Sequence, residues 1–280
     1  MSYRDRLIMK PGKSVKLADI DPGFHGQHED KDKAQPEFEA ALGRITDLQE
    51  LLYAEKKHAL LIVLQGIDAA GKDGVCWHVI TAMNPQGCVV SSFKQPSAEE
   101  LAHDFLWRVH PKAPGLGQVA VFNRSHYEDV LVVRVHDLVP KEVWSRRYEA
   151  INEFELLLSE NGVTIVKFFL YISKEEQLDR FAKRLDDPDR QWKISASDYA
   201  EREYWDSYIG AYEDMLSKCS TKHAPWFVIP SNHKWFRNLA VSSILRETMD
   251  DMGIKAPEPT VDIDEIRKKY HKAVAEEKKG

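Results

Sequence analysis

The chain has 280 residues, of which 43% are hydrophobic and 30% are charged, and its formal net charge is −6. This length suffices for one large α/β domain with appendages, and the acidic balance argues against a nucleic-acid-binding protein, which usually carries a basic excess. The longest apolar runs have about ten residues, too few to span a bilayer, and the N-terminus lacks the apolar core of a signal peptide. Because the three cysteines show no Cys-x-x-Cys spacing, we expect reduced thiols in a cytoplasmic protein.

The chain divides into three regions by composition. Residues 1–35 are polar and interrupted by proline and glycine, so we expect an extended N-terminal arm. Residues 36–255 are expected to form the main domain, beginning with a helix over 36–55 whose apolar residues fall near one face. Residues 256–280 are polar and rich in Lys and Glu, which predicts a C-terminal tail or a loosely held helix.

Apolar runs separated by helical patterns dominate the main domain. Each run is nearly continuous rather than alternating, as expected for strands covered on both faces. The alternation predicts an α/β fold, a three-layer α/β/α sandwich around a mainly parallel five-stranded sheet. The predicted strands are 59–65, 88–93, 119–122, 163–172 and 226–229.

A glycine-rich loop follows the first predicted strand. The loop reads Gly66-Ile67-Asp68-Ala69-Ala70-Gly71-Lys72, and a helix is predicted over 74–83. Strand, Gly-x-x-x-x-Gly-Lys and helix together are the pattern of a phosphate-binding loop, or P-loop. The glycines let successive N–H groups point inward, and the helix N-terminus and Lys72 add positive charge. The alternative is a glycine-rich turn with Lys72 in solvent.

This loop also departs from the common form. Asp73 stands where a Ser or Thr hydroxyl normally contacts Mg²⁺, and Asp68 lies inside the loop. Carboxylates beside a bound polyanion are unfavourable unless a cation lies between them. The sequence therefore predicts a phosphate site with a carboxylate-rich metal shell.

A second motif, Asn123-Arg124-Ser125-His126-Tyr127-Glu128-Asp129, follows the third predicted strand. Because ligands bind at the carboxyl ends of parallel strands, we expect it near the loop. Many P-loop proteins place a Mg²⁺-binding Asp at this strand end, whereas Asn123 brings no charge, which leaves Asp68, Asp73 or Asp129 to supply it. Arg124 can fork two hydrogen bonds onto a phosphate; the alternative is an ion pair with Glu128. We interpret His126 alone as a packing or hydrogen-bonding histidine.

The third motif lies in a long region, 174–217, that is charged, aromatic-rich and without a strand pattern. It runs from Gln177 to Pro188 and continues with Arg190-Gln191-Trp192-Lys193 and Asp198. On a helix, Arg180, Lys183 and Arg184 share one face. Such a basic face suits a helical lid, over about 174–200, that clamps a phosphate chain. The alternative is a solvated helix with ion pairs such as Glu176 with Arg180.

In combination, the three motifs resemble the polyphosphate kinase 2 family, which is related in fold to thymidylate kinases. The resemblance covers residues 36–250. The run Ser125-His126-Tyr127-Glu128-Asp129 resembles class III, whose members are implied to phosphorylate both AMP and ADP at the expense of polyphosphate.

The resemblance implies a role for each matching residue. Lys72 and the loop amides would hold phosphates, Arg124 would contact the phosphates at the transfer site, and Glu128 and Asp129 would position the acceptor or its metal. The implied catalytic residues are Asp68, Lys72, Arg124, Asp129 and Arg184. The implied nucleotide- and phosphate-binding residues are Gly66, Ala69, Ala70, Gly71, Lys72, Asp73, Asn123, Glu128, Arg180, Lys183, Lys193 and Asp198. The implied ligands of Mg²⁺, with Mn²⁺ as the other candidate, are Asp68, Asp73 and Asp129.

The predicted function is a reversible, Mg²⁺-dependent in-line transfer of a phosphoryl group from inorganic polyphosphate to AMP and ADP. The expected partners are polyphosphate and adenine or guanine nucleotides, without nucleic acid or membrane, and the resemblance suggests a homo-oligomer, a dimer or tetramer. One alternative is an ATP-dependent nucleotide kinase on the same fold, disfavoured by the missing loop Ser or Thr and the extra acids. The other is a non-catalytic nucleotide-binding module.

Overall fold

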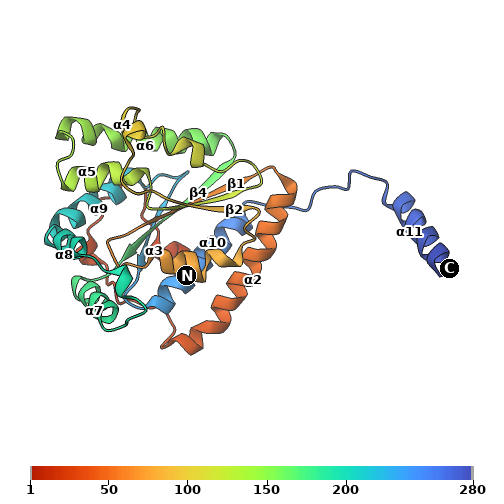
Figure 1. Ribbon diagram of the computed structural model, residues 1–280, viewed down its shortest axis with the longest axis horizontal. Helices are drawn as coiled ribbons and strands as arrows, with labels where there is room; N and C mark the ends of the chain where they lie inside the picture. The colour runs from red at the N-terminus through yellow and green to blue at the C-terminus, as the bar shows by residue number, and fades with distance from the viewer. Residues whose placement is uncertain (1, 279–280) are drawn as a thin grey trace.

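The computed structural model describes residues 2–278 and contains one parallel sheet of five strands in the order β2-β3-β1-β4-β5 (Figure 1). The central position of β1 places its carboxyl end between the ends of β3 and β4. The predicted fold class and the existence of all predicted strands are therefore confirmed. The strands are β1 (Ala59–Gln65), β2 (Cys88–Ser92), β3 (Val119–Asn123), β4 (Val163–Tyr171) and β5 (Trp226–Pro230).

Burial of both faces explains the continuous apolar runs. Every residue of β1 is buried, and successive side chains enter two different cores, with Leu60 and Ile62 in one and Leu61 and Val63 in the other. The edge strand β2 departs from this expectation, because Val89 and its neighbour are exposed.

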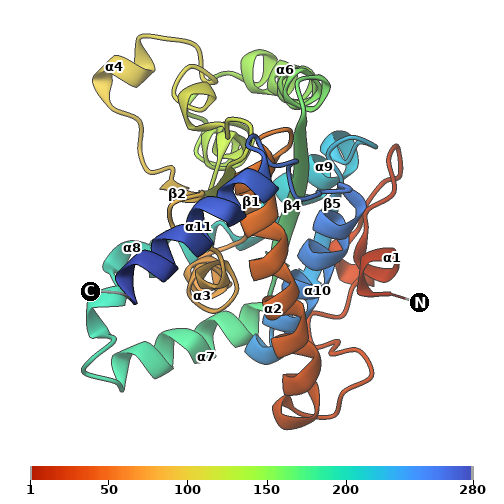
Figure 2. The same cartoon turned by 90° about the vertical axis from the view of Figure 1, so that its right-hand side faces the viewer.

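Helices cover the two faces of the sheet (Figures 1 and 2). One core joins the sheet to α2 (Lys31–Glu55), α3 (Lys72–His78) and α10 (Lys234–Asp251). The other joins it to α5 (Val132–Val135), α6 (Lys141–Glu160) and α9 (Trp205–Cys219). The three-layer sandwich is therefore as predicted.

The chain between β4 and β5 is helical, as the sequence predicts. It contains α7 (Lys174–Leu185), a short 3-10 turn η5 (Gln191–Lys193) and α8 (Ala196–Glu203) before α9. The remaining short elements are α1 (Tyr3–Leu7), η1 (Leu17–Asp19), η2 (Ile80–Ala82), α4 (Ala98–Leu101), η3 (His110–Lys112) and η4 (His126–Val130).

Two predicted helix boundaries differ from the structure. Helix α2 begins at Lys31 rather than at residue 36, because the Asp30 side chain caps it by accepting from the Lys33 N–H at 2.9 Å. Pro36 is accommodated inside this helix. The helix after the loop begins at Lys72 and ends at His78, and η2 continues the turn.

The two ends of the chain behave differently. In residues 2–30, where the sequence predicts an extended arm, α1 is helical, Ile8 forms an antiparallel bridge with Phe227 of β5, and Leu17 is fully buried. At the other end, α11 (Ile263–Glu277) is separated from the sandwich and exposed along its length except for one half-buried valine (Figure 1). Among residues 2–278, every helix is too short or too polar to pass through a lipid bilayer.

Candidate phosphate-binding and catalytic site

The glycine-rich loop lies at the carboxyl end of the central strand and leads into α3. Ala69 has φ +63° and Gly71 has φ +110°, so two of its residues adopt the left-handed conformation that curls the backbone. At Gly71 a side chain is excluded twice, by this φ and because the Arg237 guanidinium of α10 occupies the place of a Cβ. The loop backbone is therefore curled, as the two glycines of the motif predict.

Lys72, the first residue of α3, is buried in this loop. Its Nζ donates to the carbonyl oxygens of Gly66, at 2.5 Å, and Ile67, at 3.3 Å. Burial, and then the charge of Arg124, lower the pKa of Lys72 to about 8, although Asp68 and two other carboxylates oppose this. An anion bound in the loop would favour the charged lysine.

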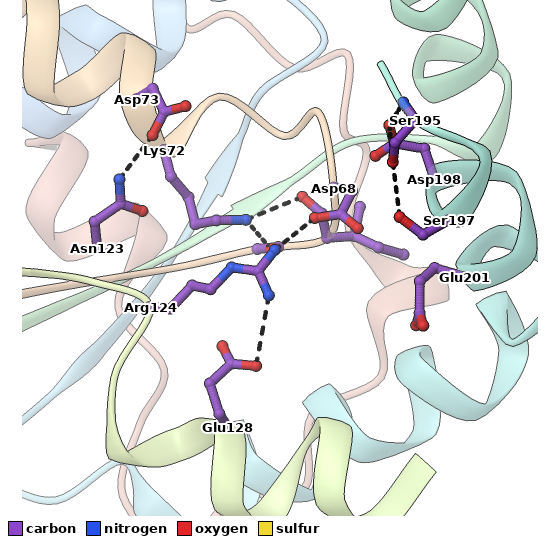
Figure 3. A network of polar contacts seen from close by, with 12 residues as sticks. Asp68, Lys72, Asp73, Asn123, Arg124, Glu128, Ser195, Ser197, Asp198 and Glu201 are labelled. Atoms are coloured by element: carbon purple, nitrogen blue, oxygen red, sulfur yellow. Dashed lines mark hydrogen bonds and ion pairs between the residues drawn. The ribbon is translucent and has the colours of Figure 1, made fainter. Parts of the chain in front are cut away.

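Arg124 follows β3 and faces the loop (Figure 3). It has φ +61°, an unfavourable conformation for a residue with a Cβ, and its N–H donates to Leu64 of β1 at 3.0 Å. The guanidinium lies 2.8 Å from an Asp68 oxygen and 3.9 Å from a Glu128 oxygen. Burial alone would lower the pKa of Arg124, but Glu128 and Asp68 raise it. The ion pair with Glu128 thus exists, but the shorter contact joins the arginine to the loop.

The candidate metal ligands do not all converge. Asn123 donates through Nδ2 to Asp73 at 2.7 Å, and Asp68 faces Arg124 (Figure 3). Among the described residues, no three His, Cys, Asp or Glu side chains come together to hold a metal by themselves. Mg²⁺, however, usually takes one or two carboxylates together with waters and substrate phosphates, and Asp68 and Asp73 beside the loop fit that need.

Asp129 lies apart from these carboxylates. Its side chain accepts from Arg147 of α6 at 2.7 Å, and burial raises its pKa to about 6. It does not line the cavity beside the loop that Asp68 and Glu128 line. The structure therefore brings Asp129 to α6 rather than to the loop.

A small cavity opens beside the loop on the side of η4. Glu201 of α8 and Tyr208 of α9 line it together with Asp68, Arg124 and Glu128. The Tyr208 hydroxyl donates to Glu201 at 2.8 Å. Sequence reasoning missed Glu201, and no local pattern marks it, because only the folding of the 174–217 region brings α8 to the loop.

The residues predicted for the lid fall into two groups. Arg180 is buried behind the loop and bound to backbone carbonyls. Lys183 and Lys193 are exposed, and Arg184 is half-buried, with Nη1 donating to the Lys193 carbonyl at 3.0 Å. Asp198 accepts from the Ser195 N–H at 2.7 Å as part of the cap of α8 (Figure 3). The capping contact gives Asp198 a local role that spacing alone did not predict.

A larger cavity, of about 560 Å³, lies between α2, α7 and the start of α10. Four cations line it: Lys31, Lys183, Lys234 and Arg237. Its lining has only one carboxylate, Glu176, and this carboxylate already pairs with Arg180. Sequence reasoning missed all of these cations except Lys183, because they come from three distant segments.

The cations of this basic cavity are poorly compensated. Burial lowers the pKa of Lys234, and so do Arg180, Arg237 and other neighbouring cations. Burial also lowers the pKa of Arg237 to about 9, and the hydrogen bonds of its guanidinium go to the Asn238 amide oxygen rather than to a carboxylate. Since an uncompensated buried cation is unfavourable, the cavity suits an anionic ligand.

The fold and the site together define a phosphotransferase of the P-loop class. The central strand ends in a P-loop, and both Lys72 and Arg124 face this loop. The basic cavity and the smaller cavity, whose lining includes three carboxylates, lie next to this loop. Residues 28–257 match the family described as Polyphosphate kinase 2 (PPK2). The chain therefore belongs to the polyphosphate kinase 2 family, as the motifs predict.

Individual relatives agree with this membership. The AMP/ADP-polyphosphate phosphotransferase of Meiothermus ruber is 48% identical over 252 residues, covering 90% of this chain and 94% of the relative. The ADP-polyphosphate phosphotransferase of Rhodopseudomonas palustris is 47% identical over 253 residues, or 86% of either chain. The crystal structure of polyphosphate kinase 2 from Arthrobacter aurescens TC1 matches with a TM-score of 0.94 at 42% identity over 97% of each chain.

Proposed function

We propose that the protein transfers the terminal phosphoryl group of inorganic polyphosphate to AMP and ADP, forming ADP and ATP, and that the reaction is reversible. The observation that carries the proposal is the basic cavity between α2, α7 and α10, which is lined by cations from all three helices and reaches the P-loop through Arg237, whose guanidinium lies against Gly71. A chain of phosphates needs such a lining along its length, whereas the triphosphate of ATP needs it only at the loop. The names of both relatives contain polyphosphate and ADP and support this donor and ADP as an acceptor, and the name of the Meiothermus ruber relative adds AMP.

The chemical task is to bring two polyanions together. Two unit charges about 4 Å apart repel by about 4 kcal/mol at an effective dielectric constant near 20. Lys72 and Arg124 supply positive charge where donor and acceptor would meet. The acceptor phosphate oxygen is already ionised near neutral pH, so alignment and charge neutralisation suffice and no covalent enzyme intermediate is needed.

We place the acceptor nucleotide at the mouth of the smaller cavity on the η4 side, whose enclosed volume of about 30 Å³ can take only one polar group of it. Glu128 lines this cavity from η4, which begins two residues after Arg124, and Glu201 and Tyr208 line it from α8 and α9. Carboxylates can accept hydrogen bonds from ribose hydroxyls or a base amino group. Cytoplasmic location and assembly into a dimer or tetramer stay predictions.

A divalent metal completes the proposal. Asp68 and Asp73 would hold Mg²⁺, or Mn²⁺, with the help of substrate phosphates. When bound, the metal neutralises charge on the phosphates that approach each other. Asp129 is left out of this ligand set, because Arg147 already holds its carboxylate.

Metal removal is the first prediction. Excess EDTA is expected to reduce ATP formation from ADP and polyphosphate to background, and added Mg²⁺ is expected to restore it, because the loop carboxylates would otherwise repel the substrates. Coupled luminescence measures the ATP formed. Turnover that persists after rigorous chelation would contradict the assigned metal dependence.

The basic cavity gives the second prediction. Lys234→Ala is expected to raise the KM for long-chain polyphosphate about tenfold, the effect of one charged hydrogen bond worth about 1.5 kcal/mol. The KM for ADP should change little, because Lys234 lines the cavity away from the acceptor side. Lys222→Ala, which removes an exposed lysine between α9 and β5, is the matched control. Equal changes in both KM values would contradict the placement of the donor.

The proposed function is tested by incubating the purified protein with AMP, Mg²⁺ and long-chain polyphosphate, without ATP, and following nucleotides by chromatography. The proposal predicts ADP and then ATP. If AMP stayed inert while ADP became ATP, the polyphosphate donor would stand and AMP would be removed from the acceptors. If neither reacted, yet ATP phosphorylated a nucleotide, the ordinary nucleotide-kinase alternative would replace it.

A further inference from the structure

The helix that the sequence predicts to be a lid begins with a segment bound tightly to the back of the P-loop. Gln177, Arg180 and Phe181 are the buried residues of α7 and lie on one face, at spacings of three and four residues. Gln177 is 1% exposed and Arg180 is 4% exposed. Such burial is unusual for a charged side chain unless its donors are all used.

The donors of these two side chains take consecutive loop carbonyls. Gln177 Nε2 donates to the Asp68 carbonyl at 3.0 Å. Arg180 Nη1 donates to the carbonyls of Ala69, at 2.8 Å, and Ala70, at 3.0 Å. The loop can point its N–H groups at a ligand only if its carbonyls point away, and outward carbonyls that are buried need donors. Here the same helix supplies them.

The rest of the Arg180 guanidinium is occupied as well. Nη2 donates to the carbonyl oxygens of Ser231, at 2.5 Å, and Asn232, at 3.2 Å, in the turn after β5, and Nε donates to Glu176 at 2.7 Å. A guanidinium has five N–H groups, and these contacts use all five. No donor remains for a phosphate. The arginine thus joins three elements, α7, the P-loop and the turn that leads into α10.

We infer that Arg180, assisted by Gln177, is a positioning residue that fixes the backbone of the P-loop from behind, and that it does not contact polyphosphate. The kinetic test of this assignment rests on the proposed function, because it uses polyphosphate as the substrate. The assignment replaces the phosphate-contact role that the family resemblance implies for Arg180. Lys183 and Arg184, one turn further along α7, keep that role. Ala69 adopts its unfavourable left-handed conformation at the point where Arg180 binds its carbonyl.

A conservative substitution distinguishes the two roles. Arg180→Lys keeps the positive charge but cannot bind four carbonyls and a carboxylate in one plane. A direct phosphate contact would survive this change in part. The positioning role predicts that kcat falls about 10²-fold, the effect of a misplacement of about 1 Å at a reacting centre. Gln177→Ala removes an uncharged donor and is expected to give the same loss of kcat to a smaller extent.

Salt dependence separates charge from geometry. When a cation that contacts a polyanion is removed, the slope of log KM for polyphosphate against log salt concentration becomes shallower. We expect Lys183→Gln to reduce this slope, and Arg180→Lys and Arg180→Gln to leave it unchanged while lowering kcat. A shallower slope in Arg180→Gln would overturn the inference and return Arg180 to the polyphosphate site.

Amide hydrogen exchange of the free protein supplies a readout that does not require polyphosphate to be the substrate. Faster exchange is expected for peptides covering residues 66–72 in Arg180→Lys and Gln177→Ala, with β4 and α6 unchanged. Unchanged loop exchange in both variants would contradict the positioning role. If wild-type protein failed to use polyphosphate, the proposed function would fall, but the exchange comparison would still decide the role of Arg180. If Arg180→Lys did not fold, Gln177→Ala alone would carry the test.

Discussion

Replacing Arg124 by alanine is expected to lower kcat for polyphosphate-dependent ADP phosphorylation by about 10²–10³, the loss typical of removing one positioned transition-state donor. Arg124 is held in a left-handed conformation at the end of β3, and its guanidinium lies 2.8 Å from Asp68 in the P-loop. The variant also frees Asp68 and Glu128 of a cation beside the phosphate site, which adds repulsion. Steady-state rates with saturating polyphosphate and ADP measure the effect.

Two controls sharpen this experiment. Arg124→Lys keeps the charge but loses the forked geometry, so we expect a smaller loss than with alanine. Arg146→Ala removes an exposed arginine of α6 and is expected to leave kcat unchanged. Near-normal turnover of Arg124→Ala would remove Arg124 from the catalytic residues.

Removing the carboxylate of Glu155 is expected to destabilise the protein by about 3–5 kcal/mol, because it leaves a buried lysine without its counter-charge. Lys167 of β4 donates to Glu155 at 2.5 Å, to the Tyr127 hydroxyl at 2.7 Å and to the Cys219 carbonyl at 2.8 Å. Glu155 also lies within hydrogen-bond distance of His126 and Tyr127. Denaturant unfolding of Glu155→Leu measures the loss.

A double-variant cycle identifies the cause. Glu155→Leu combined with Lys167→Met leaves neither charge buried, so we expect the pair to be less destabilised than Glu155→Leu alone. Glu153→Leu, at an exposed position of α6, should change stability by about 0.5 kcal/mol or less. Additive losses in the double variant would show that the two charges are not coupled.

This buried network matters for the site because of its position in the chain. His126 and Tyr127 directly follow Arg124 and Ser125. Three side-chain contacts anchor them to α6 and β4: Glu155 with each of them, and Lys167 with Tyr127. His126 is thus the hydrogen-bonding core histidine that the sequence indicates. A fixed η4 keeps Arg124 and Glu128 facing the loop.

The sheet could be read from the sequence because its strands are buried on both faces. Short continuous apolar runs such as Leu60–Leu64, bounded by turn residues, predict strands in the interior of a parallel sheet. The start of α2 was less accessible, because Pro36 is a common first-turn residue and Asp30, the true cap, lies in a polar segment without apolar periodicity.

The centre of the site was also predictable, since consecutive residues build it. Gly66 to Asp73 form the loop, and Asn123, Arg124 and Glu128 follow a neighbouring strand, so topology alone brings these two motifs together. Their grouping in the structure is the one that the sequence predicts.

The parts that sequence reasoning missed depend on side-chain direction or on distant segments. Asp129 adjoins Glu128, but on η4 it turns toward Arg147 of α6. Helical spacing places Arg180 and Lys183 on the same face of α7. In the structure, however, Arg180 is buried against the loop, whereas Lys183 is exposed at the surface. Arg237 belongs to no motif, and its place under Gly71 follows only from the packing of α10 on α3.

The most direct test of the central claim uses ³²P-labelled polyphosphate as the sole phosphate donor and unlabelled AMP as the acceptor. The proposed transfer predicts label in the β-phosphate of ADP and then in both added phosphates of ATP, with none formed by Lys72→Met. Unlabelled nucleotides in this reaction, together with labelling of AMP from [γ-³²P]ATP, would contradict a polyphosphate donor.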